Sequence, residues 1–336
     1  MKREPEHTHL GLILESKLSF NKHIQEKISK AKSNTGMIKH LNRYLPFHSL
    51  NQMYKIFVRS HLDYCDIIYH LPPIFHPPPL STTFAELMER IEKVQYQAAL
   101  AVTGAWQGTS RIKLYAELGW ESLSDRRFTR RILQIHKIVD RKTPTYLVDK
   151  LPPNHNVLIH LPYVFQEVEC RTKRFGKTFF PDAISTWNDF IIQFEDFPTF
   201  ANFKKYVLSL TRSKMKSTFK VFDPCYLRHL FQLRCGLSQL RYHKKRHNFV
   251  DTPTDTCSCL SDVEDTNHYL LFCPLYFLQR VTLLQSVNEI LREKNLAIEI
   301  NSELLLYGHP MLDTLDNKEV LLATLNFIKT TNRLFA

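Results

Sequence analysis

The sequence predicts a mainly α-helical protein with one short strand near its N-terminus. Only 8 of the 336 residues are glycine and 12% are aromatic, a composition that indicates a compact helical chain rather than a disordered one. Apolar side chains also recur at three- and four-residue steps in several segments, which is the period of helices with one buried face. A chain of this length suggests about two domains with a real core.

The strand and the first helices are expected in the N-terminal region. The motif His9-Leu-Gly-Leu-Ile-Leu14 predicts a short strand, and the following Glu15-Ser16-Lys17 predicts a turn. Ser19 can cap the next helix, because a serine oxygen accepts from the free backbone N–H groups of a first helical turn. A second helix is expected from about Ser49. The positions expected on the buried face of the first helix are Ile24, Ile28, Ala31, Thr35 and Ile38.

A proline-rich stretch separates these elements from the rest of the chain. We expect a stiff, non-helical linker over 71–83. The capping box Thr83-Phe-Ala-Glu86 predicts the start of the following helix. Charge and motif changes then divide the chain into five regions: a strand with the first helices (1–70), the linker (71–83), a helical middle region (84–200), a basic helical region (201–256) and a small C-terminal module (257–336).

The C-terminal module contains a cysteine–histidine motif that suits a metal ion. Cys257 and Cys259 are followed by His268 and Cys273. Zinc favours four nitrogen or sulfur ligands in a tetrahedron, and three thiolates with one neutral imidazole form a common structural set. The alternative is a helix over 266–276 that merely contains a histidine and a cysteine. The sequence therefore predicts one zinc ion, with this alternative left open.

The net charge of +12 is unevenly distributed along the chain. Residues 1–256 hold 39 Lys and Arg against 23 Asp and Glu, whereas residues 257–336 hold 6 against 10. Within 204–246 there are 12 basic residues and the single acid Asp223. A concentrated cationic stretch is typical of a protein that binds phosphate backbones. The alternative is a solvated basic face without a partner.

Candidate nucleic-acid contacts follow from this charge distribution. They are basic residues of the cationic stretch, with two lysines of the first helix added: Arg228, Arg234, Arg241, Lys244, Lys245, Arg246, Lys22 and Lys30. Aromatic side chains in or beside the stretch could stack on bases, although we expect most of them to be core residues: Phe219, Phe222, Tyr226, Phe231, Tyr242 and Phe249.

The pattern around the cysteines resembles a known family. The order Cys257-Ser-Cys259, Glu264-Asp, His268 to Cys273-Pro and then Arg280 is similar to the zinc-knuckle-like segment near the C-terminus of LINE-type (non-LTR) retrotransposon reverse transcriptases. The jockey-like and CR1-like relatives are the most similar in pattern. That pattern usually has a glycine after the second cysteine, where this chain has Leu260.

Other segments resemble the same family, so that the similarity spans about residues 9–335. They include Leu10-Gly-Leu-Ile-Leu14, the block from Arg171 to Trp187-Asn188, and Leu306-Tyr-Gly308 with Asn317. The resemblance implies that residues 1–70 contain the end of a palm strand and a helical thumb, which in that family grips the template–primer duplex. It further implies a zinc-knuckle-like module at 257–336 and RNA or DNA as the partner.

The catalytic part of such an enzyme is not found in this sequence. A reverse transcriptase needs paired carboxylates that hold two metal ions, and this chain has no Asp-Asp pair. The segment Leu62-Asp-Tyr-Cys-Asp66 has Ile67 where a second aspartate would follow, and we interpret its two acids as structural. Gly176-Lys-Thr178 lacks the first glycine of a phosphate-binding loop, because Arg171 stands in its place. We expect no enzyme activity from this chain by itself and no small-molecule substrate.

Location and alternatives complete the sequence-based hypothesis. No apolar run reaches the roughly 18 residues that a membrane helix needs, so no membrane is expected as a partner. The charged N-terminus is unlike a signal peptide, and seven cysteines without a secretory signal indicate reduced thiols inside the cell, in the nucleus or cytoplasm. The first hypothesis is a non-catalytic nucleic-acid-binding fragment. The alternatives are a zinc-stapled structural or protein-interaction module, and a degenerate mobile-element relic without selected function.

Overall fold

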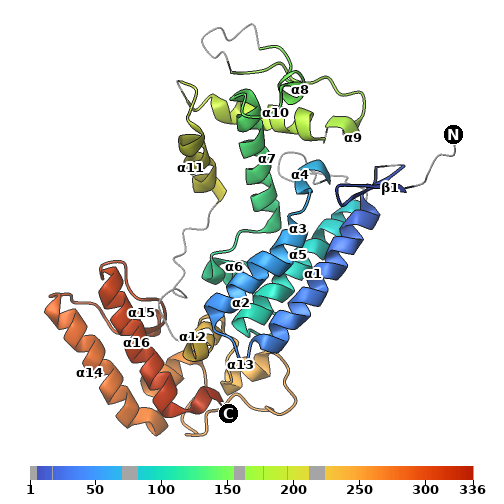
Figure 1. Cartoon of the computed structure of the whole chain (residues 1–336). Coiled ribbons are helices and arrows are strands. Elements are labelled where there is room, and N and C mark those ends of the chain that lie inside the picture. The colour runs from blue at the N-terminus through green and yellow to red at the C-terminus, as the bar shows by residue number, and fades with distance from the viewer. Residues whose placement is uncertain are drawn as a thin grey trace. The chain divides into compact units, whose positions relative to one another are not determined.

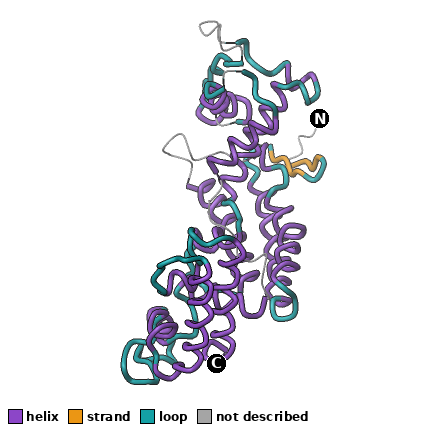
Figure 2. Tube along the Cα trace, turned by 90° about the vertical axis from the view of Figure 1, so that its left-hand side faces the viewer, coloured by secondary structure: helices purple, strands orange, loops and turns teal. Residues whose placement is uncertain are grey.

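The computed structural model shows a mainly helical protein with a two-stranded N-terminal sheet, which confirms the predicted fold class (Figures 1 and 2). Most of the predicted linker, residues 71–81, lies outside the described residues, and α5 (Thr82–Thr103) begins directly after it. None of the described helices combines the length and the apolar character needed to cross a membrane. The structure describes residues 6–16, 18–69, 82–154, 163–176, 178–194, 196–211 and 224–335.

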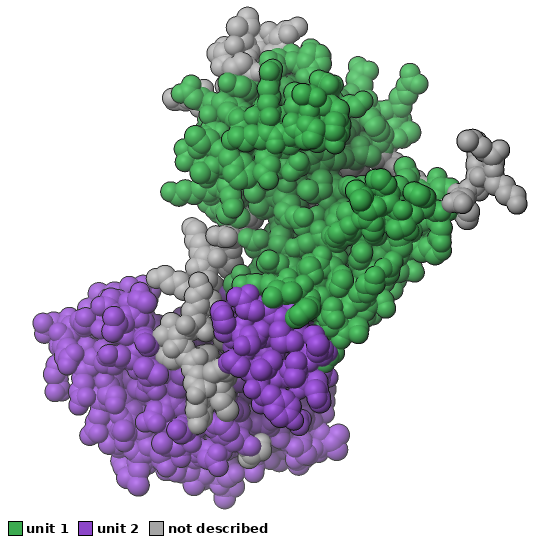
Figure 3. All heavy atoms as spheres, viewed as in Figure 1, with its two compact units in different colours: residues 1–36, 54–97, 119–215 green, residues 37–53, 98–118, 216–336 purple. Residues whose placement is uncertain are grey.

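The chain forms two compact units, and each is assembled from three separate stretches (Figure 3). Unit 1 comprises residues 1–36, 54–97 and 119–215. Unit 2 comprises residues 37–53, 98–118 and 216–336. The five regions proposed from the sequence follow chain order and stay a prediction.

The N-terminal strand forms a hairpin with a second strand. β1 (Glu6–His9) pairs antiparallel with β2 (Leu12–Glu15). Leu10 and Gly11 form the two-residue turn, with φ angles of 45° and 77°. Positive φ at both central residues is the geometry of the hairpin turns that match strand twist. The strand predicted over 9–14 is therefore interrupted by this turn.

The start of α1 (Asn21–Leu41) is held by a glutamate rather than by a serine. The carboxylate of Glu15 accepts from the backbone N–H of Lys22 at 3.4 Å and from the Ser19 hydroxyl at 2.6 Å. Ser19 therefore bonds to the side chain that contacts the first helical turn. The prediction that Ser19 itself caps the helix is wrong, because Glu15 at the end of β2 occupies that role.

The core of unit 1 is built around an indole. Trp187 is fully buried on α10 (Phe179–Ile191), and its Nε1 donates to the carbonyl of Tyr163 at 2.8 Å. The neighbouring Asn188 amide holds the backbone of Phe165, accepting from its N–H at 3.0 Å and donating to its carbonyl at 2.8 Å. The family-like block ending in Trp187-Asn188 thus fastens a loop to a helix.

The other elements of unit 1 surround this core and the first part of α1. α7 (Leu123–Val139) carries a long buried face and packs against α10 and α11 (Phe200–Thr211) (Figure 1). Besides the start of α5, these elements are η1 (Tyr54–Val58), α3 (Arg59–Leu62), α4 (Asp66–Tyr69), α7 (Leu123–Val139), α8 (Thr145–Val148), α9 (Lys173–Gly176), α10 and α11 (Phe200–Thr211).

Unit 2 is a helical assembly in which α14 (Phe277–Glu293) and α16 (Thr314–Thr331) lie side by side (Figure 1). Asn317 closes the turn before α16: its Oδ1 accepts from the N–H of His309 at 2.7 Å, and its Nδ2 donates to two carbonyls. The elements of this unit, besides the ends of α1 and α5, are α2 (Phe47–Met53), α6 (Arg111–Leu118), α12 (Pro224–Cys235), α13 (Arg241–Arg246), η3 (His268–Phe272), η4 (Pro274–Tyr276), α14 (Phe277–Glu293), α15 (Ser302–Tyr307), α16 (Thr314–Thr331) and η5 (Arg333–Phe335).

A buried ion pair joins three helices of unit 2. Arg234 on α12 contacts Glu117 on α6 at 2.9 Å, and both side chains are less than 5% exposed, at 3% and 4%. Its Nε also donates to the carbonyl of Leu306 on α15 at 2.6 Å. Breaking one partner of such a pair would leave an uncompensated charge in the interior. Arg234 is therefore a structural residue of this unit.

Candidate metal centre

A tight turn places the first two cysteines of the motif. An isolated bridge pairs Thr256 with Val263, and the N–H of Cys257 donates to the carbonyl of Asp262 at 2.9 Å. Within the turn, the N–H of Leu260 donates to the carbonyl of Cys257 at 2.9 Å. Leu260 has a φ of 63°, in the left-handed region that glycine usually occupies. The turn thus forms although leucine stands where the family pattern has glycine.

A π-helical turn places the other two ligands. His268 begins η3, and the N–H of Cys273 donates to the carbonyl of His268 at 2.7 Å. The side chain of Asp265 accepts from the N–H of His268 at 2.8 Å and so starts this turn. Cys273 leaves the helix with a ψ of 119°, and Pro274 begins a separate short turn. The continuous helix over 266–276, which the sequence left open as an alternative, is interrupted at Cys273.

The four ligand atoms converge on one point. The sulfur and ring-nitrogen atoms of Cys257, Cys259, His268 and Cys273 all lie within 4.8 Å of one another. The Sγ atoms of Cys257 and Cys273 are 3.6 Å apart, and Sγ of Cys259 lies 3.2 Å from Nε2 of His268. In a tetrahedral zinc site with Zn–S of about 2.3 Å, neighbouring ligand atoms are separated by about 3.5–3.8 Å. These residues could hold one metal ion.

The acidity of the thiols differs within this cluster. Burial raises the pKa of Cys257 to about 12 and also raises the pKa of Cys273. Burial acts in the same direction on Cys259, but hydrogen bonds from Ser261, Cys257 and His268 outweigh it and bring that pKa down to about 6. A divalent cation would displace the remaining thiol protons, because thiolates are the form that binds metal.

A glutamate fastens the ligand turn to two distant segments. Glu264 is 1% exposed and accepts from the guanidinium of Arg333 at 2.7 and 2.6 Å. The same carboxylate accepts from the backbone N–H of Arg241 at 2.8 Å, at the start of α13. The pair is bidentate and charge-assisted, the strongest class of side-chain hydrogen bond. Glu264 therefore connects the ligand turn, α13 and η5 within unit 2.

An arginine closes the other side of the cluster. Arg280 on α14 donates from Nε to the carbonyl of Leu270 at 3.0 Å and from Nη2 to the carbonyl of Cys273 at 2.6 Å. The carbonyl of Cys273 also accepts from the backbone N–H of Tyr276 at 3.3 Å, so the guanidinium adds a second donor at the end of this helical turn. Burial lowers the pKa of Arg280, while negative charge at Cys273 acts to raise it. The guanidinium thus lies directly behind a ligand residue.

The predicted nucleic-acid contacts have diverse surroundings. Arg234 is in the interior of unit 2, as described above. Arg228 donates to the carbonyl of Asn42 at 3.2 Å, and Arg241 donates to the carbonyl of Thr256 at 3.0 Å. In unit 1, two lysines of α1 are exposed and form ion pairs with nearby glutamates: Lys22 with Glu6 and Lys30 with Glu26.

α13 presents the remaining predicted contacts. Lys244 lies 3.0 Å from Asp251 and Lys245 lies 3.0 Å from Asp255, while Arg246 is exposed. Four basic residues of the cationic stretch fall outside the described residues: Arg212, Lys214, Lys216 and Lys220. The structure therefore brings Lys244, Lys245 and Arg246 together on one short helix, and binding by them stays a prediction.

The predicted stacking aromatics separate into interior and surface rings. Phe231 is 1% exposed, whereas Tyr242 and Phe249 are 38% and 39% exposed. The ring of Phe249 lies 4.8 Å from that of Trp106, which the sequence analysis had not considered. The side chains of Phe219, Phe222 and Tyr226 lie outside the described residues. The rings of Tyr242 on α13 and of Phe249 just after it are therefore accessible.

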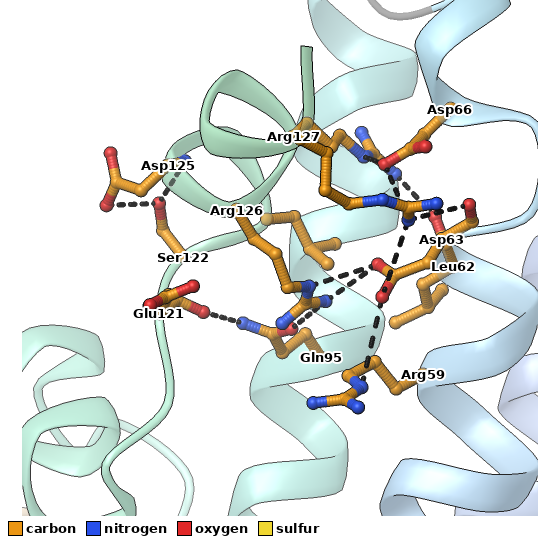
Figure 4. Close-up of polar contacts among 12 residues, drawn as sticks. Arg59, Leu62, Asp63, Asp66, Gln95, Glu121, Ser122, Asp125, Arg126 and Arg127 are labelled. Atoms are coloured by element: carbon orange, nitrogen blue, oxygen red, sulfur yellow. Dashed lines mark hydrogen bonds and ion pairs between the residues drawn. The ribbon is translucent and has the colours of Figure 1, made fainter. Parts of the chain in front are cut away.

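The two acids of the segment 62–66 are held by arginines (Figure 4). Asp63 accepts from Nε and Nη2 of Arg126 at 3.1 and 2.9 Å. Asp66 is 1% exposed, lies 3.1 Å from Arg130 and 3.9 Å from Arg127, and has its pKa raised to about 6 by burial. These contacts join α3 and α4 to α7, in keeping with the structural interpretation of both acids.

Sequence patterns did not indicate the roles of three charged residues around the cluster. Glu264 and Arg280 were considered only as members of the family-like pattern, and Arg333 was given no role. A usable signal was present for Arg280, which is the one charged residue in the run from His268 to Leu284. A charge in such a run is expected to be paired or hydrogen-bonded.

Comparison with known proteins gives no match for this chain, whether with protein-family models, with curated sequences or with solved structures.

We predict that Leu260→Gly stabilises the ligand turn. Leu260 is 83% exposed, so its side chain contributes little packing, while a non-glycine residue in the left-handed region costs roughly 1–2 kcal/mol. Glycine also gains entropy in the unfolded chain, so the net gain should be about 0.5–1 kcal/mol. Urea unfolding followed by circular dichroism measures the change. Leu260→Ala is the matched control, since it removes the side chain but keeps the strain; equal stability of both variants would contradict the prediction.

Proposed function

We propose that this chain is a non-catalytic nucleic-acid-binding fragment that resembles the post-palm region of a retrotransposon RNA-directed DNA polymerase, with one zinc ion in its C-terminal module. The observation that carries the proposal is the juxtaposition, within unit 2, of a Cys₃His cluster and the exposed cationic helix α13. Glu264 joins the two directly, because it follows the ligand turn and accepts from the N–H of Arg241.

The donor set favours zinc over other common ions. Three thiolates and an imidazole are soft and borderline ligands, which suit zinc and do not suit magnesium or calcium. All four positions of a tetrahedron come from the protein, as in structural rather than catalytic zinc sites. The metal would therefore close the ligand loop and hold it against α13, and it would supply no reaction.

Zinc binding is the first consequence to test. Purified protein should contain one zinc per chain by elemental analysis, because four ligands already lie within 4.8 Å of one another. Cys273→Ser should abolish this zinc, since serine does not supply the thiolate. Cys235→Ser is the matched control, as this thiol belongs to the same unit but not to the cluster. A zinc content near zero in the natural chain, or one unchanged by Cys273→Ser, would refute the metal part of the proposal.

The exposed side of α13 suits a nucleic-acid backbone. Tyr242, Lys245 and Arg246 follow helical spacing of three and four residues and are all exposed, so they lie on one face. Phe249 follows at the end of the helix with its ring 39% exposed. The ion pairs of Lys244 and Lys245 with aspartates are partly exposed, and such pairs contribute little stability. Phosphate groups can therefore replace the aspartates as partners.

We expect binding of RNA and DNA that weakens steeply with salt. Each phosphate contact releases counterions, so the logarithm of the affinity should fall by about 0.9 per logarithmic unit of salt for each duplex contact. Replacing Lys244, Lys245 and Arg246 together by alanine should flatten this slope by about three such contacts and weaken binding to all sequences alike. Fluorescence titration of short labelled RNA and DNA oligonucleotides at several salt concentrations measures the slope.

The matched control for this triple variant removes equal charge elsewhere in unit 2. Arg292, Lys294 and Lys318 serve this purpose, because Lys294 likewise pairs with aspartates on the surface. Their replacement by alanine should leave the slope close to that of the natural chain. Equal slopes in all three proteins, or no binding at low salt, would contradict the assignment to α13.

A second candidate function, protein interaction, is favoured by an exposed apolar strip after the last ligand. Its five side chains are Phe272, Leu275, Phe277, Leu278 and Val281, which are 67%, 54%, 62%, 76% and 36% exposed. Exposed apolar patches of this kind mark interaction surfaces. A groove of about 240 Å³ borders the strip and contains no charged side chain; it is lined by Leu278, Gln279, Thr282, Leu283, Ser286, Ala323, Asn326, Phe327 and Thr330.

A second copy of the chain is the partner that this surface fits best. The apolar strip and the uncharged groove share Leu278, so a two-fold axis would place the strip of each copy in the groove of the other. Sedimentation velocity over a range of concentrations should then detect a dimer that Leu278→Glu with Val281→Glu dissociates. Leu315→Glu, at an exposed position of α16 outside the strip, is the control and should leave the dimer intact. A monomer at all concentrations would remove this candidate.

A further inference from the structure

Arg280 is a buried arginine that hydrogen-bonds only to carbonyl groups. The residue is 6% exposed. Its guanidinium donates to the carbonyls of Leu270 at 3.0 Å, Cys273 at 2.6 Å and Tyr269 at 3.5 Å. Within the part of the chain that the structure describes, no carboxylate lies within ion-pair distance of it. Carbonyl dipoles satisfy its N–H groups and leave its net charge without a counter-charge.

The other buried arginines each have an acidic partner. Arg127 lies 3.9 Å from Asp66, Arg131 lies 3.0 Å from Asp182, and Arg234 lies 2.9 Å from Glu117. The interior of this protein therefore accepts guanidinium groups by pairing them with carboxylates. A guanidinium stays protonated in proteins, and an uncompensated buried charge is strongly destabilising. Arg280 departs from this arrangement and requires another source of negative charge.

The ligand cluster supplies that charge once a divalent ion is bound. Three thiolates and a neutral imidazole around a doubly charged cation leave one net negative charge. Cys257, His268 and Cys273 are buried and Cys259 is half-buried, so most of this complex would be in the interior with the arginine. Nη2 of Arg280 already donates to the backbone of Cys273, which places the guanidinium beside a ligand residue.

We propose that Arg280 is the counter-ion of the metal–thiolate complex and that it thereby sets how tightly the site binds a divalent ion. This inference rests on the metal part of the proposed function. Arg280 is a positioning residue with a second role: its hydrogen bonds hold the end of η3, and its charge offsets the complex. Loss of the charge leaves that anion uncompensated, which favours the state in which the ion has left and the freed thiolates have taken up protons.

The test is the zinc affinity of matched variants of the full chain, measured by competition with a chromophoric chelator. Arg280→Met should weaken zinc binding by about 10–100-fold, the range typical for residues that support metal ligands. Arg280→Lys keeps the positive charge and should stay within a few-fold of the natural chain. Arg292→Met removes an exposed arginine from the same helix and should change nothing. If Arg280→Lys binds zinc as weakly as Arg280→Met does, the hydrogen bonds of Arg280 rather than its charge support zinc binding, and the proposal is wrong.

A second comparison isolates the charge by changing the complex. Cys259→His makes the ligand set two thiolates and two imidazoles, which with zinc is electrically neutral. In that background the effect of Arg280→Met on zinc affinity should shrink to a few-fold, whereas an undiminished effect would overturn the proposal. Should Arg280→Met fail to fold, the zinc affinity of Arg280→Lys decides alone. A tenfold or greater loss of affinity in that variant would overturn the inference. Absence of zinc binding by the natural chain would instead refute the metal site itself.

Discussion

A buried guanidinium must be given acceptors, and this requirement determines which segments of the chain lie together. Arg127 and Arg131 on α7 are 2% and 1% exposed. Arg127 donates to the carbonyl of Leu62 at 2.8 Å, and Arg131 contacts Asp182 at 3.0 Å, so α7 is fixed to α3 on one side and to α10 on another. Arg234 does the same in unit 2, where it joins α12 to α6 and α15. The buried arginines therefore determine which helices pack against one another.

The same requirement limits what a tally of charges can indicate about function. Arg234 belongs to the cationic stretch in the sequence, yet its partner Glu117 lies 117 residues earlier in the chain. Arg228 and Arg241 in the same stretch donate to backbone carbonyls. Such partners are brought near only by the fold, so the sequence cannot separate interior arginines from surface ones. In the described part of this stretch, the exposed basic side chains are Lys245 and Arg246 on α13 and Lys204 and Lys205 on α11.

The ligand cluster was predictable because its chemistry is local. Cysteine and histidine at 257, 259, 268 and 273 identify themselves as ligands by type and spacing, and the mainly helical fold followed from apolar periodicity. The backbone details were less accessible: the turn at Leu10-Gly11 and the left-handed Leu260 depend on φ angles that sequence patterns indicate only through glycine. The pair of Glu264 with Arg333 was missed because it spans 69 positions, whereas Arg280 lies 7 to 11 residues from its partners and its local signal was not used.

The bidentate pair between Glu264 and Arg333 has a consequence for the order of events during synthesis. The two residues are separated by 69 positions, whereas all four ligands fall within 257–273. At translation rates of about 5–20 residues per second, the complete ligand segment exists for roughly 3–12 s before Arg333 has been made. A metal ion can close the ligand loop during this interval, and the carboxylate–guanidinium pair cannot. The nascent chain could therefore bind a metal ion before it forms the pair with Arg333, and metal supply during translation would then act on a ligand loop held only by segments made before it, such as α13.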